Sequence, residues 1–149
     1  MKIAVGCDHG GYALKEAVIA ELRKRGIEIV DKGCADTSSV DYPDYALAVA
    51  EEVASGACER GVLMCGTGIG ISIAANKVKG IRCAVCHDMF TAAMSAEHNK
   101  ANIIALGGRI LTPEQAAEMV GIWLDTPFGG GRHQSRVDKI SAIEEKYFK

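Results

Sequence analysis

The chain carries almost no net charge. Its 17 lysines and arginines stand against 19 aspartates and glutamates, which gives a formal net charge of −2 at pH 7. No global electrostatic field therefore draws the protein to nucleic acid or to an anionic membrane. We expect no nucleic-acid partner and no membrane partner.

Long apolar runs are also missing, and the longest ones are far too short to span a bilayer. The first residues lead straight into a strand-like run, without the basic and apolar regions of a signal peptide. We therefore expect a cytoplasmic protein. No internal repeat, low-complexity tract or long linker divides the sequence, so residues 1–149 are predicted to form a single domain.

Six cysteines are present, but a disulfide framework is not expected, because the chain is neither short nor apparently secreted. Several of them lie in apolar strand-like runs, where a free thiol behaves as a small hydrophobic side chain. Cys83 and Cys86 have the spacing of a redox or zinc pair. Their surroundings read as a buried strand, which would place the two thiols on opposite faces. A thiol redox protein remains the less favoured alternative.

Strand-like and helical patterns alternate along the chain. In the first helix, Leu14, Val18 and Leu22 recur at every fourth position, and charged residues fill the other face. The alternation predicts a parallel sheet with helices on both faces. The expected strands are 2–6, 27–30, 62–65, 82–86 and 103–106. The expected helices are 12–25, 43–55, 69–77, 89–97, one beginning at 112–113, and 137–147.

The last expected helix follows the glycine-rich break 129–131 and carries an apolar set. Its members are Val137, Ile140, Ile143 and Tyr147. Two arrangements fit this pattern. The helix packs either on its own domain or on a partner subunit.

Polar residues gather where the predicted strands end, and ligands of open parallel sheets bind at the carboxyl ends of strands. The segments in question are 6–11, 65–70, 87–88 and 107–109. The polar groups of the chain thus cluster where the fold predicts a site. His87 and Asp88 have a simpler explanation as a helix start, with Asp88 near the N-cap.

The stretch 64–72, MCGTGIGIS, places a thiol beside a loop with a glycine at every second position. The loop lacks the Lys-Ser/Thr end of a P-loop, and its spacing differs from the dinucleotide-binding fingerprint. Its backbone N–H groups at a helix start could hold negative charge. A tight turn without a ligand is the alternative.

Cys65 opens this loop. Thiols at helix N-termini ionise more readily than free cysteine. A thiolate here could take a proton from carbon, and the loop amides could hold the enediolate oxygen that results. An inert buried cysteine is the alternative explanation.

Other titratable residues are candidates too. Asp8 and His9 end the first strand and are followed by two glycines, which favours a site. Arg132 and Arg136 would share one face of a helix and would suit phosphate oxygens, although a solvated face explains them as well. The pair at positions 98–99 is ambiguous by itself.

Taken together, the chain resembles the ribose 5-phosphate isomerase B family, which also includes the galactose 6-phosphate isomerase subunits. The resemblance runs in order through the whole chain. It is carried by the segments 5–11 (VGCDHGG), 65–70 (CGTGIG), 74–77 (AANK), 97–102 (EHNKAN) and 130–134 (GGRHQ).

The resemblance implies a Rossmann-like, three-layer α/β/α sandwich with a five-stranded parallel sheet. It implies an aldose–ketose isomerase of the pentose phosphate pathway that interconverts ribose 5-phosphate and ribulose 5-phosphate without a metal or an organic cofactor. The site would lie at a dimer interface and draw on both subunits. A homodimer or a tetramer is expected.

The resemblance also implies roles for individual residues. Cys65 matches the general base, and the loop of Gly66, Thr67, Gly68, Ile69 and Gly70 matches the enediolate site. Thr67 and His98 match the residues that help to open the furanose ring. Sugar hydroxyls would be bound by Asp8, Tyr42 and Asn99. The phosphate would be bound by His9, Arg109, Arg132 and Arg136.

Two positions set this chain apart. One branch of the family uses a glutamate base on the helix after the glycine loop, and Ile71 holds that position here, which favours Cys65. Gly129 stands where the family often has an acidic residue. Two further alternatives are an isomerase of a six-carbon sugar phosphate, such as allose or galactose 6-phosphate, and a phosphosugar-binding module without catalysis.

Overall fold

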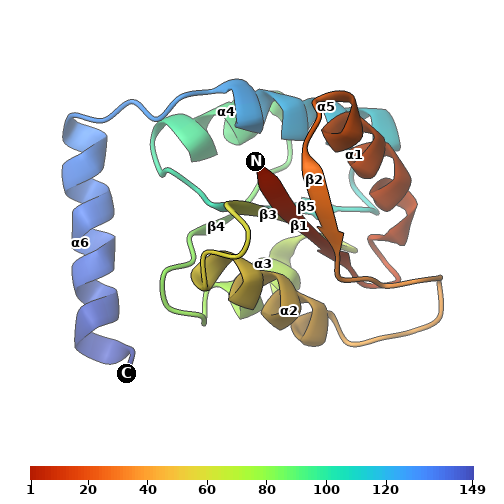
Figure 1. Cartoon of the computed structure of the whole chain (residues 1–149), viewed down its shortest axis with the longest axis horizontal. Helices are drawn as coiled ribbons and strands as arrows, with labels where there is room; N and C mark the ends of the chain where they lie inside the picture. Colours follow the sequence, from red (N-terminus) through yellow and green to blue (C-terminus); the bar gives the residue numbers. More distant parts are fainter.

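The computed structural model describes all 149 residues, and a five-stranded sheet lies at its centre (Figure 1). The strands are β1 (Lys2–Cys7), β2 (Glu28–Asp31), β3 (Arg60–Cys65), β4 (Cys83–Val85) and β5 (Ile103–Gly107). All pairings are parallel, and the spatial order is β2-β1-β3-β5-β4. The predicted parallel sheet of five strands is confirmed.

Helices cover both faces of the sheet, which confirms the predicted three-layer sandwich (Figure 1). One face carries α1 (Tyr12–Lys24), α4 (Met89–Glu97) and α5 (Pro113–Asp125), and the other carries α2 (Tyr42–Ala54) and α3 (Ile69–Ala75). Each layer buries its own apolar cluster against the sheet. The predicted stripe of Leu14, Val18 and Leu22 on α1 is fully buried.

Local sequence signals fix several helix starts. The Asp88 side chain accepts the Thr91 backbone N–H at 2.7 Å, which caps α4. The Thr112 hydroxyl accepts the Gln115 N–H at 3.1 Å, while the Gln115 side chain accepts the Thr112 N–H. Asp88 is thus a helix cap.

Strand β4 is shorter than the predicted 82–86. At its start the Arg82 backbone N–H donates to the side chain of Asn102 at 2.8 Å instead of to a strand carbonyl. The ladder with β5 therefore begins one residue later, at Cys83. A hydrogen bond from a distant side chain cannot be read from an apolar pattern.

The last helix, α6 (Arg132–Tyr147), begins five residues before the predicted start. Its first turn holds Arg132, His133 and Gln134, which show no apolar periodicity, so the pattern marked only the part from Val137 onward. The helix stands apart from the three layers (Figure 1). Val137 is buried, but Ile140, Ile143 and Tyr147 are 42%, 60% and 69% exposed.

No helix of the structure is long and apolar enough to cross a membrane.

Candidate active site

A cavity of about 430 Å³ opens at the carboxyl ends of β1 and β3. The chain leaves β1 toward one edge of the sheet and returns to β3 on the other side of β1, so the two strands flank the point where the winding reverses. Ligands of open α/β sheets bind at such points. The cavity is lined by Asp8, His9, Gly10, Tyr42, Cys65, Gly66, Thr67, Ile69, Gly70 and Arg109.

Cys65 is the last residue of β3 and lines this cavity. Its sulfur accepts the Gly68 backbone N–H at 3.1 Å. Gly68 has a φ of +81°, which favours glycine, and this left-handed turn directs its N–H back to the thiol. The sulfur is therefore a hydrogen-bond acceptor, as a group that takes up protons must be.

The loop after Cys65 offers further donors. The backbone N–H groups of Gly66, Thr67 and Gly70 donate to no acceptor of the protein. The Thr67 hydroxyl accepts the Ile69 N–H at 3.2 Å, which leaves its own hydrogen free to donate. Several donors without a protein acceptor thus lie in the loop that follows one thiol, which suits an oxygen that gains negative charge.

Asp8 and His9 follow β1 and face the same cavity. The nearly buried Asp8 carboxylate accepts the N–H groups of Gly10 and Gly11 at 2.8 and 3.1 Å, which fixes the turn. The Val40 N–H donates to Nδ1 of His9 at 3.2 Å. The proton of a neutral His9 then lies on Nε2, the nitrogen able to donate to an anion.

Two larger side chains stand over the glycine loop. A Cβ atom at Gly66 would meet the guanidinium of Arg109 at 3.0 Å, and one at Gly70 would meet the Tyr42 ring at 2.7 Å. Arg109 forms no ion pair within the chain. Because Gly66 and Gly70 have no side chains, Arg109 and Tyr42 can approach the backbone of the loop closely.

The structure does not bring all predicted site residues together. His98, Asn99, Arg132 and Arg136 do not line the cavity around Cys65. They belong to the end of α4 and the start of α6, and Arg132 and Arg136 form no ion pair. The predicted site is thus divided between two places in one chain.

His133 joins these two elements, and sequence reasoning gave it no role. Its ring stacks on that of His98, with centroids 4.2 Å apart and planes 15° from parallel. Partial burial lowers the pKa of His133, and the positive charges of His98, Arg132 and Arg136 lower it further. The only sequence signal was its place between two arginines, and a stacking partner 35 positions away leaves no local pattern.

Gly129 lies at this junction. Its N–H donates to the Glu97 carbonyl at 2.9 Å, and a Cβ atom there would meet the His133 ring at 3.1 Å. The absence of a side chain at Gly129 therefore leaves room for the close approach between the start of α6 and the end of α4.

The other cysteines lie outside this cavity, and all six cysteines are free. Burial raises the pKa of Cys7 to about 12, and it also raises the pKa of Cys58, Cys83 and Cys86. These thiols are poor nucleophiles at neutral pH. No three His, Cys, Asp or Glu side chains are grouped so that they could hold a metal ion.

Known proteins match this chain over nearly its whole length. Residues 3–140 match the model of the Ribose/Galactose Isomerase family. Ribose-5-phosphate isomerase B of Escherichia coli is 49% identical over 145 residues, which is 97% of each chain. The structure of Clostridium thermocellum ribose-5-phosphate isomerase B superimposes with a TM-score of 0.96, 56% identity and 99% coverage of both chains.

A trypanosomal enzyme extends the match. The structure of type B ribose 5-phosphate isomerase from Trypanosoma cruzi is 47% identical with a TM-score of 0.94, covering 99% of this chain and all of that one. The residue patterns, the strand order and these matches agree, and the chain belongs to the ribose/galactose isomerase family of sugar-phosphate isomerases.

Proposed function

We propose that the protein interconverts D-ribose 5-phosphate and D-ribulose 5-phosphate through a cis-enediolate. The observation that carries this proposal is the thiol of Cys65 within a cavity, hydrogen-bonded to one loop amide and flanked by unpaired ones. The names of the relatives support the substrate.

Cys65 is the general base. Its thiolate removes the proton from C2 of the open-chain aldose, and the electron pair of that bond forms the C1–C2 double bond while O1 gains the negative charge. The proton of the C2 hydroxyl passes to O1, and the thiol returns its proton to C1, which yields the ketose. Base catalysis of this kind contributes about 10²–10⁴-fold.

The glycine loop stabilises the enediolate. The N–H groups of Gly66, Thr67 and Gly70 have no acceptor in the protein, so they are available to the charged oxygens without breaking a bond. Donors fixed in advance stabilise developing charge at little reorganisation cost, and the loss of one typically lowers turnover about 10²–10³-fold.

Ring opening precedes the proton transfer, because ribose 5-phosphate exists mainly as a furanose. The O1 hydroxyl must lose a proton and the ring oxygen must gain one. We assign these transfers to His98 and to Thr67, whose hydroxyl hydrogen is free.

Recognition falls to the polar groups around the cavity. Asp8, Tyr42 and Asn99 bind sugar hydroxyls. The phosphate is held by Nε2–H of His9 and by Arg109, Arg132 and Arg136, which carry no carboxylate partner. Arginine forks match phosphate oxygens in pairs.

A homodimer completes this site, alone or as part of a tetramer. His98, Asn99, Arg132 and Arg136 stand outside the cavity of their own chain, and α6 exposes Ile140 and Ile143. An isologous interface would place the end of α4 and the start of α6 of one subunit over the Cys65 cavity of the other, twice.

The first experiment measures conversion of ribose 5-phosphate with a chelator present. The native protein and Cys58→Ala, which truncates a buried thiol outside the cavity, should both turn over. Cys65→Ala should lose about 10²–10⁴-fold in kcat while it stays folded. Full turnover of folded Cys65→Ala would overturn its assignment as the base.

Failure of the native protein on ribose 5-phosphate would overturn the substrate. Allose 6-phosphate and galactose 6-phosphate would then be tested in the same assay. Saturable binding of a sugar phosphate without any product would instead identify a binding module.

A further inference from the structure

The turn that follows α4 is held in an uncommon conformation. Lys100 has a φ of +47° and is the only residue other than glycine with a positive φ. Its N–H and that of Ala101 return to the carbonyls of Ala96 and Ser95 at 3.3 and 2.9 Å. A left-handed lysine costs about 1 kcal/mol or more, so other contacts must hold this turn.

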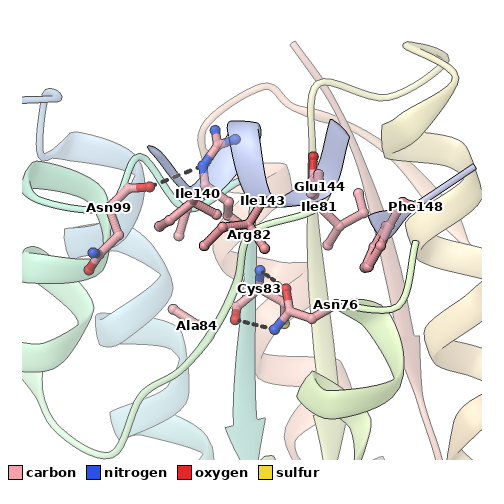
Figure 2. A pocket seen from close by; sticks show the side chains of 11 residues that line it. Asn76, Ile81, Arg82, Cys83, Ala84, Asn99, Ile140, Ile143, Glu144 and Phe148 are labelled. Atoms are coloured by element: carbon pink, nitrogen blue, oxygen red, sulfur yellow. Dashed lines mark hydrogen bonds between the residues drawn. The ribbon is translucent and has the colours of Figure 1, made fainter. Parts of the chain in front are cut away.

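Arg82 makes those contacts. Its Nε donates to the carbonyls of Asn99 and Lys100 at 3.1 and 3.3 Å, and its Nη2 donates to Lys100 at 2.9 Å. Figure 2 shows the guanidinium reaching Asn99 beside Ile140 and Ile143 of α6. Arg82 pairs with no carboxylate, and all the hydrogen bonds of its guanidinium go to this turn.

The backbone of Arg82 is itself fixed. The Asn102 side chain accepts the Arg82 N–H at 2.8 Å and donates to the Gly80 carbonyl at 2.8 Å. The Arg82 carbonyl accepts the Asn102 N–H at 3.1 Å. The guanidinium therefore extends from a rigid base at the start of β4.

The turn carries two residues of the proposed site. His98 is the cap residue of α4, and Asn99 is the residue whose carbonyl Arg82 binds. His98 stacks on His133 of α6, and the Glu97 carbonyl binds Gly129 just before that helix. The position of the turn thus sets the position of His98 and of the first turn of α6.

We propose that Arg82 is a positioning residue for ring opening: its guanidinium holds the carbonyls of Asn99 and Lys100, and thereby sets the imidazole of the preceding His98 against the furanose. This inference rests on the proposed function. Proton transfer depends steeply on distance, and a shift of about 1 Å costs roughly 10²-fold.

The test compares turnover of the cyclic aldose with proton exchange at the open-chain ketose. Ribulose 5-phosphate cannot close a furanose ring because its O5 carries the phosphate, so Cys65 can exchange its C1 proton with solvent without any ring opening. Arg82→Met should lower kcat from ribose 5-phosphate by about 10–10²-fold and should lower the exchange of this C1 proton with solvent deuterium several-fold less.

A matched control is Arg60→Met. Arg60 lines the same small cavity as Arg82 but bonds weakly to the Trp123 carbonyl and not to the turn. This variant should leave both the turnover of ribose 5-phosphate and the proton exchange of ribulose 5-phosphate unchanged. Arg82→Lys keeps the charge but not the fork, and it should show the same asymmetry to a smaller degree.

A spectroscopic readout covers variants of low activity. The imidazole NMR signals of His98 and His133 should shift in Arg82→Lys and Arg82→Met and not in Arg60→Met. Equal losses of ribose 5-phosphate turnover and of ribulose 5-phosphate proton exchange, or unmoved imidazole signals, would overturn the proposal. If the native protein does not isomerise ribose 5-phosphate but the imidazole signals still shift in the Arg82 variants, the proposed function is overturned. Arg82 then stands only as the residue that places His98.

Discussion

At the scale of single residues, two cysteines show how far surroundings decide chemistry. Cys7 and Cys65 end neighbouring strands of one sheet. Cys7 is fully buried with its sulfur 3.7 Å from that of Cys34, and burial raises its pKa to about 12. Cys65 faces a cavity and accepts an amide hydrogen. Only the second environment suits a base.

His133 provides a prediction at this scale. Partial burial and the charges of His98, Arg132 and Arg136 lower its pKa, so its imidazole should titrate below the usual value near 6.5. Replacing His98 with Gln removes the stacked ring and one positive charge, and the pKa of His133 should then rise. An NMR titration measures both values.

The same shift sets a direction for stability. The unfolded chain binds the His133 proton more readily than the folded one, so this residue favours unfolding as the pH falls below about 6.5. If His133 titrated at or above its ordinary pKa, burial and the charges of His98, Arg132 and Arg136 would not be what governs its pKa.

At the scale of elements, α1 and α5 end side by side and share one arginine. Arg25, the cap residue of α1, binds both carboxylate oxygens of Asp125 at 2.6 and 3.0 Å, and its Nε binds Glu21 at 2.7 Å. A positive charge at the carboxyl ends of two helices also suits their dipoles.

Arg25→Met should therefore destabilise the protein by about 1 kcal/mol at pH 7, the upper end for an exposed pair. A loss of that size lowers Tm by about 2–4 °C in a chain of this length. Arg25 lowers the pKa of Asp125 and Glu21, so its contribution is present above pH 4.5 and is lost as the pH falls through their lowered values.

Thermal unfolding at pH 7 and at acid pH measures this difference, with Arg23→Met as the control. Arg23 lies in the same last turn and pairs with no carboxylate. A Tm difference that persisted unchanged at acid pH would contradict an ionic origin.

At the scale of the whole molecule, α6 is the helix whose apolar side chains are left largely exposed by the rest of the chain. Its residues Ile140 and Ile143 line a largely apolar cavity of about 370 Å³ with Ile81 and Phe148 (Figure 2). This cavity shares no lining residue with the cavity around Cys65. Exposed isoleucines on a separate helix are typical of a surface that another subunit buries.

Replacing both Ile140 and Ile143 with Asp should thus give a folded monomer without turnover, because the charges cannot be buried in an interface. Light scattering and the isomerase assay measure the two effects. The control is Lys139→Asp, which adds an acidic residue at an exposed position of the same helix. A native protein that is monomeric and active would contradict the shared site.

Mixed dimers test the sharing of the site itself. Cys65→Ala and His98→Gln should each be inactive alone, yet a mixed dimer would hold one intact site. Random co-assembly should then restore about a quarter of native activity. No recovery in verified mixed dimers would place both residues within one subunit.

The sequence by itself determined the alternation of strands and helices, the parallel sheet and most helix starts. These features depend on neighbouring residues, such as the Thr112 cap and the stripe of Leu14, Val18 and Leu22. The glycine loop and Cys65 were also recognisable, because one strand and the turn after it carry both.

Only the tertiary structure decided which residues meet. It brought Asp8, Tyr42 and Arg109 to the cavity of Cys65, and it set His98 and Arg132 apart from it. It also paired His98 with His133 and Arg82 with the turn at Asn99. Contacts between residues 17 to 35 positions apart arise from the packing of whole elements, and no local pattern records them.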